Sequence, residues 1–223
     1  MTITYLENYG YMFEAVNCTI VVDYVRGKIP EMRSDKPIYV LASSRSPDHY
    51  NERIFRLSEQ YDDVYYFLSS DIEGGGRIPK EKVKLVTFVH PGEDFQLARF
   101  TLHAVPTGGL GVAFSFHVST FSVLHAGSLE DAFNADDEGK RTHRKFLKAV
   151  EGLSPSYDIV FVPANPALGP HMATSAREIL DGRRASTIFP LAFQNDWTIA
   201  GKLSAALGRE VMSVHKKGQV WEV

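Results

Sequence analysis

The sequence predicts an α/β fold, because short apolar strands alternate along the chain with amphipathic helices. Residues 38–42, 64–68 and 159–163 are continuous apolar runs, and runs of this length are typical of strands buried on both faces. Residues 137–153 carry Phe146, Leu147, Val150 and Leu153 at helical spacing, which predicts a helix with one apolar face. These patterns favour strands and helices packed in layers.

The first seventy residues predict strands that surround one polar loop. Strands are expected at 3–6, 11–14 and 19–23, with turn residues between them. The strand 38–42 leads into the polar stretch 43–49, and loops that follow buried strands are common places for chemistry. Ile54, Leu57 and Ser58 have helical spacing, so a short helix is expected before the strand 64–68.

The rest of the chain predicts a flexible connection, a strand-rich region and further helices. Gly74, Gly75 and Gly76 lack the Lys-Ser or Lys-Thr ending of a phosphate-binding loop, so a surface loop is favoured over a nucleotide site. Strand signals dominate from 83 to 127, with a hairpin over 112–117 and 121–125. Helices are expected at 172–180 and at 196–207, the second ending at Gly208.

Composition favours one globular domain, residues 1–223, in a reducing compartment. The formal charge is -3 and 44% of the residues are hydrophobic, so the chain has no basic excess for binding nucleic acid. The single cysteine, Cys18, cannot form an internal disulfide, and its apolar context indicates a buried strand thiol. No apolar run approaches the length of a membrane span. We therefore expect a cytoplasmic protein that contacts neither membrane nor nucleic acid.

The polar loop at residues 41–51, LASSRSPDHYN, resembles the signature loop of the metallo-β-lactamase superfamily. That loop has the pattern His-x-His-x-Asp-His after a buried strand, and only its last pair, Asp48 and His49, is present here. In the full motif, imidazoles and carboxylates hold metal ions that deprotonate a bridging water near neutral pH. Taken alone, an Asp-His pair is more often a hydrogen-bonded loop than a metal site.

The resemblance extends over about residues 1–207. The hairpin 3–14 resembles the family's first hairpin, and Val21-Val22-Asp23 resembles its next strand, which ends at an acidic residue. Residues 111–114 and 125–127 resemble a later hairpin, and 160–163 with 189–191 resemble the approach to the last metal ligand. The resemblance implies the four-layered αβ/βα sandwich, with a branch of small metal-dependent hydrolases similar to ascorbate-6-phosphate lactonase as its nearest group.

The same matching implies that most metal ligands have been lost. Ser44 and Ser46 stand where the first two histidines belong, Ser128 stands at the metal-bridging aspartate, and Ala192 stands at a later histidine. The middle ligand region, 106–110, also offers no His, Asp or Glu. Catalytic zinc sites keep three protein ligands, and serine hydroxyls are poor substitutes. Asp48 and His49 remain as residual metal ligands that should hold zinc only weakly.

Other polar residues have ordinary interpretations. We interpret His125 as a packing or supporting residue, and His103 and His117 as hydrogen-bonded residues of predicted strands. The acidic residues from Glu130 to Glu138 are interpreted as a solvated loop that leads into a helix N-terminus, where acids are favourable. A nucleophilic Ser44 or Ser46 activated by His49 and Asp48 is a further, weaker hypothesis, since closeness in sequence does not establish geometry.

Three functions remain open. The first is a non-catalytic relative of metal-dependent hydrolases, with no cofactor, whose vacated pocket is inert or binds a small polar or anionic molecule. The expected lining of that pocket is Ser44, Arg45, Ser46, Asp48, His49, Ser128 and Ala192, where Arg45 would favour an anion or neutralise Asp48. The second is a hydrolase of phosphodiesters or lactones that uses zinc or another divalent metal. The third is an interaction protein that uses the segments 74–82 or 130–140. The sequence does not indicate the oligomeric state.

Overall fold

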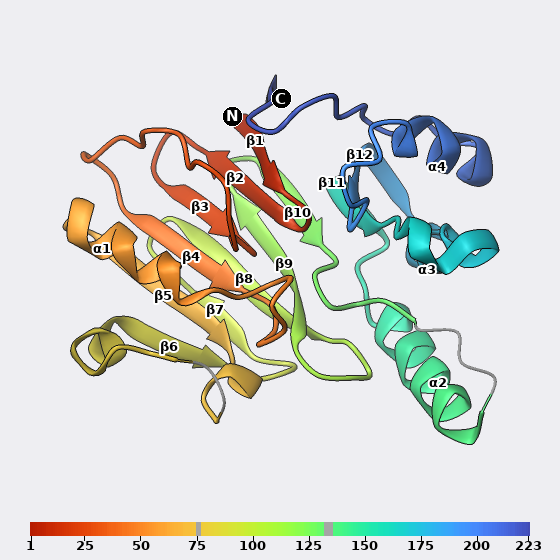
Figure 1. The fold of residues 1–223 in the computed structure, drawn as a ribbon, viewed down its shortest axis with the longest axis horizontal. Helices are drawn as coiled ribbons and strands as arrows, with labels where there is room; N and C mark the ends of the chain where they lie inside the picture. Colours follow the sequence, from red (N-terminus) through yellow and green to blue (C-terminus); the bar gives the residue numbers. More distant parts are fainter. Residues whose placement is uncertain (75–76, 132–135) are drawn as a thin grey trace. The chain divides into compact units, whose positions relative to one another are not determined.

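The computed structural model describes residues 1–74, 77–131 and 136–223, and these form two compact units. One unit contains residues 1–90 with 215–223, and the other contains 91–214. Each unit has its own mixed sheet and its own helices, as Figure 1 shows. The α/β class predicted from the sequence is therefore confirmed. The expectation of a single domain stays a prediction, because compactness does not show whether either unit folds alone.

In the first unit, the described residues form one seven-stranded sheet in the order β13-β1-β2-β3-β4-β5-β6. The strands are β1 (Thr2–Glu7), β2 (Gly10–Glu14), β3 (Thr19–Val22), β4 (Ile38–Ala42), β5 (Val64–Ser69), β6 (Val86–Val89) and β13 (Val220–Glu222). β1, β2 and β3 pair antiparallel, whereas β3, β4, β5 and β6 are parallel. The strands expected at the start of the chain are confirmed, and β13 was not expected.

The first helical elements of the first unit lie between β4 and β5. They are a 3-10 turn, η1 (Glu52–Arg56), and the short helix α1 (Leu57–Gln60). Ile54, Phe55 and Leu57 belong to the same buried cluster as Val40 and Tyr66. Burying side chains of this size stabilises the fold by about 1.5–3 kcal/mol each. Two further 3-10 turns, η2 (Ser70–Ile72) and η3 (Lys80–Leu85), precede β6.

In the second unit, the described residues form one six-stranded sheet in the order β12-β11-β10-β9-β8-β7. The strands are β7 (Asp94–Gln96), β8 (Phe100–Pro106), β9 (Val112–Val118), β10 (Phe121–His125), β11 (Ser156–Pro163) and β12 (Arg184–Leu191). β7 to β10 are antiparallel, and the predicted β9–β10 hairpin is confirmed. β10, β11 and β12 are parallel, so their carboxyl ends lie along one edge.

The helices of the second unit are α2 (Asp137–Glu151), α3 (Thr174–Leu180) and α4 (Ile199–Leu207), with the 3-10 turn η4 (Pro166–His171) before α3. Asp136 caps α2 by accepting from the amide of Gly139 at 2.7 Å. Gly208 ends α4 with a φ of 63°, a left-handed conformation that glycine adopts without strain. α4 begins three residues later than expected, because Asp196 instead binds the amide and hydroxyl of Thr198.

Candidate functional site

The predicted ligand loop, residues 43–49, follows the carboxyl end of β4. Because β3 and β5 flank β4 in parallel, the residues that follow all three strands meet at one edge of the sheet. Asp23 comes directly after β3, and Asp71 comes two residues after β5. The loop therefore lies between two carboxylates, and both bind it.

Asp23 is the centre of a fully buried hydrogen-bond network. Its Oδ1 accepts from the amide of Ser43 at 2.7 Å, and its Oδ2 accepts from the Ser43 hydroxyl at 2.7 Å. The Nδ1 of His49 lies 2.8 Å from the same Oδ2. A carboxylate can only accept, so we assign the proton of the imidazole to Nδ1. Such a carboxylate–imidazole pair fixes the ring and leaves Nε2 as the site for a proton or a metal.

Asp48 lies on the exposed side of the loop and is held by the turn between β1 and β2. The Nδ2 of Asn8 donates to Asp48 Oδ1 at 3.2 Å. The next residue in that turn, Tyr9, packs on the ring of His49 with 4.0 Å between ring centroids. The predicted pair of residual metal ligands is thus divided between two environments, because His49 is buried and Asp48 is exposed.

Ser44 and Arg45 bind Asp71. The sequence had suggested His49 and Asp48 as partners of Ser44, and Asp48 as a partner of Arg45. The Ser44 hydroxyl and the Arg45 amide both donate to Asp71 Oδ2 at 3.1 Å. The Arg45 side chain is exposed, and among the ion pairs of the described residues none joins it to Asp48. The Ser44 hydroxyl also accepts from the amide of Ser46 at 3.3 Å. Hydrogen bonds within the protein therefore occupy these polar groups.

A serine nucleophile in this loop is not supported by the contacts. The serine that touches the imidazole is Ser43, whose Oγ is 3.0 Å from His49 Nδ1, while Ser44 is bound to Asp71. The Ser43 side chain is fully buried, and His49 Nδ1 already carries the proton that it donates to Asp23, so it cannot act as the base for Ser43. Sequence reasoning missed Ser43 and Asp71. The signal for Asp23 was present, since an acid directly follows an apolar strand.

Ser128 and Ala192 belong to the second unit, at the edge where its parallel strands end. Ser128 follows β10 and Ala192 directly follows β12, with β11 between these strands. The Ser128 Oγ is buried and has no hydrogen-bond partner within the described ranges. Three non-glycine residues after β12, Ala192, Gln194 and Asn195, have φ values of 60°, 49° and 63°. Left-handed residues of this kind cost about 1–3 kcal/mol each and cluster at functional sites.

The acidic stretch from Glu130 to Glu138 is not simply a solvated loop, and residues 132–135 within it lie outside the described residues. Asp131 is 1% exposed, its carboxylate binds the Nδ1 of His143 on α2, and its amide donates to the Ser175 hydroxyl at 3.1 Å. Interpreting Asp131 as solvated was wrong, because a partner twelve residues later makes its burial possible. Asp136, Asp137 and Glu138 do lie at the N-terminus of α2, as expected.

The other histidines considered have the supporting positions that we predicted. His103 Nδ1 lies 2.8 Å from Asp94 Oδ1, and His117 Nδ1 lies 3.5 Å from Thr101 Oγ1, each between neighbouring strands. His125 is fully buried at the end of β10, and its ring packs against Phe161 at 5.5 Å.

The donor set near the loop does not fit a bound metal ion. Over residues 1–74, 77–131 and 136–223, no group of three or more His, Cys, Asp or Glu side chains is placed to hold one. In the loop, His49 uses Nδ1 for Asp23, and Asp48 uses one oxygen for Asn8. The next residue, Tyr50, donates its hydroxyl to Arg77 O at 3.0 Å, and burial raises the pKa of Tyr50 to about 12, so it stays protonated.

Comparison with solved structures identifies the fold. The metallo-β-lactamase fold protein YhfI from Bacillus subtilis matches with a TM-score of 0.65 and 16% identity, covering 99% of both chains. Igni18, a metallo hydrolase from Ignicoccus hospitalis, matches with a TM-score of 0.65 and 13% identity, covering 100% of this chain and 98% of its own. This chain has the metallo-β-lactamase fold. The resemblance inferred from the sequence is thereby confirmed at the level of the fold.

A third match is to part of a larger protein. CmlA, a diiron β-hydroxylase from Streptomyces venezuelae, matches with a TM-score of 0.65 and 12% identity over 100% of this chain, which spans 54% of CmlA. No family model matches the sequence, and no curated protein does. No described helix is long and apolar enough to cross a membrane. Identities this low inform on the fold alone, because function depends on the site.

Proposed function

We propose that this chain is a non-catalytic relative of metal-dependent hydrolases that binds a small polar molecule at the 43–49 loop. The observation that carries the proposal is the hydrogen bond of the Ser44 hydroxyl to Asp71. Ser44 stands at the position of a histidine ligand in the resemblance, and its hydroxyl lies 3.1 Å from Asp71 Oδ2. A serine in this state offers a metal neither imidazole nor thiolate nor carboxylate.

The surroundings of the loop contain polar atoms that a ligand could bind. Asn8 Oδ1 and Asp71 Oδ1 are buried and have no hydrogen-bond partner within the described parts of the chain. An unsatisfied buried acceptor costs about 1–3 kcal/mol, so a ligand that brings donors into this region would recover part of that cost. Asp48 and Arg45, both exposed, can contact the same molecule from the solvent side, and Arg45 would favour an anionic group.

Metal content tests the proposal directly. Protein purified without chelators is expected to contain far less than one zinc per chain by elemental analysis, and to gain no stability when zinc is added. Zinc near one or two equivalents, lost together with thermal stability on chelation, would refute the non-catalytic proposal.

A metal-dependent hydrolase of phosphodiesters or lactones is the second candidate, in the branch that resembles ascorbate-6-phosphate lactonase. One observation favours it: Asp23 fixes His49 in the tautomer that leaves Nε2 able to bind a metal. Turnover of bis(p-nitrophenyl) phosphate or of a lactone that requires added zinc would support it. His49→Ala must then abolish that turnover, whereas His90→Ala, at an exposed residue after β6, must not.

A further inference from the structure

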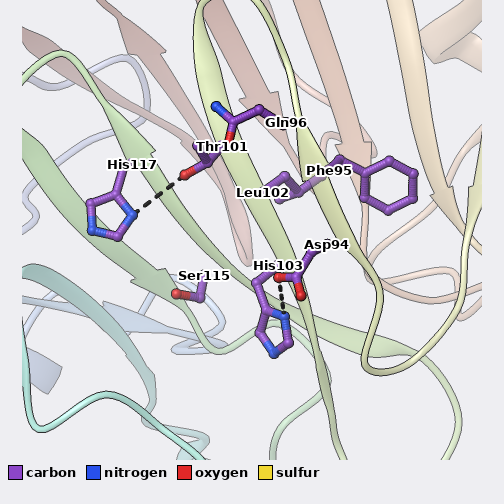
Figure 2. A pocket seen from close by; sticks show the side chains of 8 residues that line it. All are labelled: Asp94, Phe95, Gln96, Thr101, Leu102, His103, Ser115 and His117. Carbon is purple, nitrogen blue, oxygen red and sulfur yellow. Dashed lines mark hydrogen bonds and ion pairs between the residues drawn. The ribbon is translucent and has the colours of Figure 1, made fainter.

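The strands β7, β8 and β9 carry a polar pocket in the second unit that includes no residue of the 43–49 loop. It has a volume of about 430 Å³ and is lined by Asp94, Phe95, Gln96, Thr101, Leu102, His103, Ser115 and His117. This size falls within the range of small-molecule sites, about 300–1,000 Å³. Figure 2 shows Ser115 between the two imidazoles, with Thr101 and Gln96 beyond them.

The strand register arranges the polar side chains in two rows. Asp94 pairs with His103, which pairs with Ser115, and these three form the first row. Gln96, Thr101 and His117 form the second row through the same pairings. Residues of one row lie side by side on one face of the sheet. The alternate residues of β8 and β9, among them Leu102 and Phe116, are buried, so apolar packing fixes this register.

The two imidazoles are oriented by partners on the neighbouring strands. His103 Nδ1 lies 2.8 Å from Asp94 Oδ1, and His117 Nδ1 lies 3.5 Å from Thr101 Oγ1. The Nε2 atoms therefore stay available to a ligand, together with the Ser115 hydroxyl and the Gln96 amide. The pocket thus offers both donors and acceptors from three strands.

The charge of the lining restricts the ligand. No lysine or arginine is among the eight lining residues, so an anionic ligand would meet no permanent positive charge. The one carboxylate, Asp94, is bound to His103 and its side chain is 81% exposed, which leaves it screened and weakly attractive to cations. A hydroxyl group both donates and accepts, and therefore matches this lining best.

We propose that the β7–β9 pocket is a binding site for a neutral polyhydroxylated molecule, such as a saccharide. Phe95 lies in the alternate row with Leu102, and Figure 2 shows its ring away from the two imidazoles, so the polar rows supply the ligand contacts. The face of an antiparallel sheet that meets solvent is often polar without binding anything. Such faces and edge strands, however, commonly carry long charged side chains, lysine above all, and this lining has none.

The test is an amide NMR titration of the full-length chain with maltose, with glucuronate and phosphate as charged probes. Saturable shifts at residues 94–96, 101–103 and 115–117 with maltose are expected. His117→Ala and Ser115→Ala should each weaken binding about two- to tenfold, the effect of one lost hydrogen bond. Thr120→Ala, at the exposed β9–β10 turn, is the matched control and should bind as the unmodified chain does.

Three results would overturn the proposal. One is a titration with maltose that never saturates. The second is tighter binding of glucuronate or phosphate at the same residues. The third is unchanged maltose affinity in His117→Ala. Thermal unfolding of each variant confirms that it is folded.

Discussion

Replacing Ser43 by alanine isolates the strongest contact of the 43–49 loop. The Ser43 hydroxyl donates to Asp23 Oδ2 at 2.7 Å, and both side chains are fully buried. Hydrogen bonds to charged groups contribute about 1.5–3 kcal/mol, and water cannot replace the lost donor at a site without solvent contact. Asp23 keeps the Ser43 amide and His49 as donors. We therefore expect Ser43→Ala to lower the free energy of unfolding by about 1.5–3 kcal/mol.

Urea denaturation followed by circular dichroism measures this loss, with Ser46→Ala as the control in the same loop. Ser46 is bonded through its backbone, since its carbonyl accepts from the amide of His49 at 2.9 Å, so its substitution should change stability by about 0.5 kcal/mol or less. In thermal unfolding, the Ser43→Ala loss corresponds to about 3–12 °C in Tm for a chain of this size. Equal midpoints for the two variants would refute the structural role of the Asp23 network.

Two further predictions concern the second unit. Gly108→Ala should destabilise the fold by about 2 kcal/mol or more, since φ is +84° and a Cβ would lie 2.7 Å from the Phe146 amide nitrogen. Gly109 has open space around it, so Gly109→Ala should unfold at nearly the same temperature as the unmodified chain. Similar losses in the two variants would contradict the packing argument. Lys202 and Thr198 lower the pKa of Asp196 to about 2. Because its folded pKa lies below the unfolded one, Asp196 stabilises the fold above about pH 4 and this contribution is lost as the pH falls through about 2. Lys202→Ala should raise that pKa in a carbon-detected NMR titration, and an unchanged titration would exclude the ion pair.

Local sequence patterns predicted the sheets well, because burial and strand period are properties of neighbouring residues. The short apolar run at 38–42 predicted a buried strand, and the polar stretch after it predicted the loop. β13 escaped prediction, since Val220–Glu222 has too few residues for a periodic pattern and forms a strand only by pairing with β1.

The contacts within the site could not be predicted, because they join residues far apart in sequence. Asp23 meets His49 across 26 residues, and Asp71 meets Ser44 across 27. Nothing local distinguishes Ser43, which binds Asp23, from Ser44, which binds Asp71. Only the parallel order of β3, β4 and β5 brings the three strand ends together. Asp131 shows the opposite error, since its acidic neighbours indicated solvent while its partners on α2 and α3 allow burial.

The Asp23–His49 pair also bears on what His49 does in this fold. In a metal enzyme, such a pair orients an imidazole ligand. Here the same carboxylate receives the Ser43 amide and hydroxyl in addition to the imidazole, so it joins β3 to the loop after β4 whether or not a metal is present. Replacing either partner would leave a buried polar group unpaired, at a cost of about 1–3 kcal/mol. Ser46 differs, because it is only partly buried and makes its hydrogen bonds through its backbone. Stability therefore retains His49, and its presence alone is weak evidence for zinc.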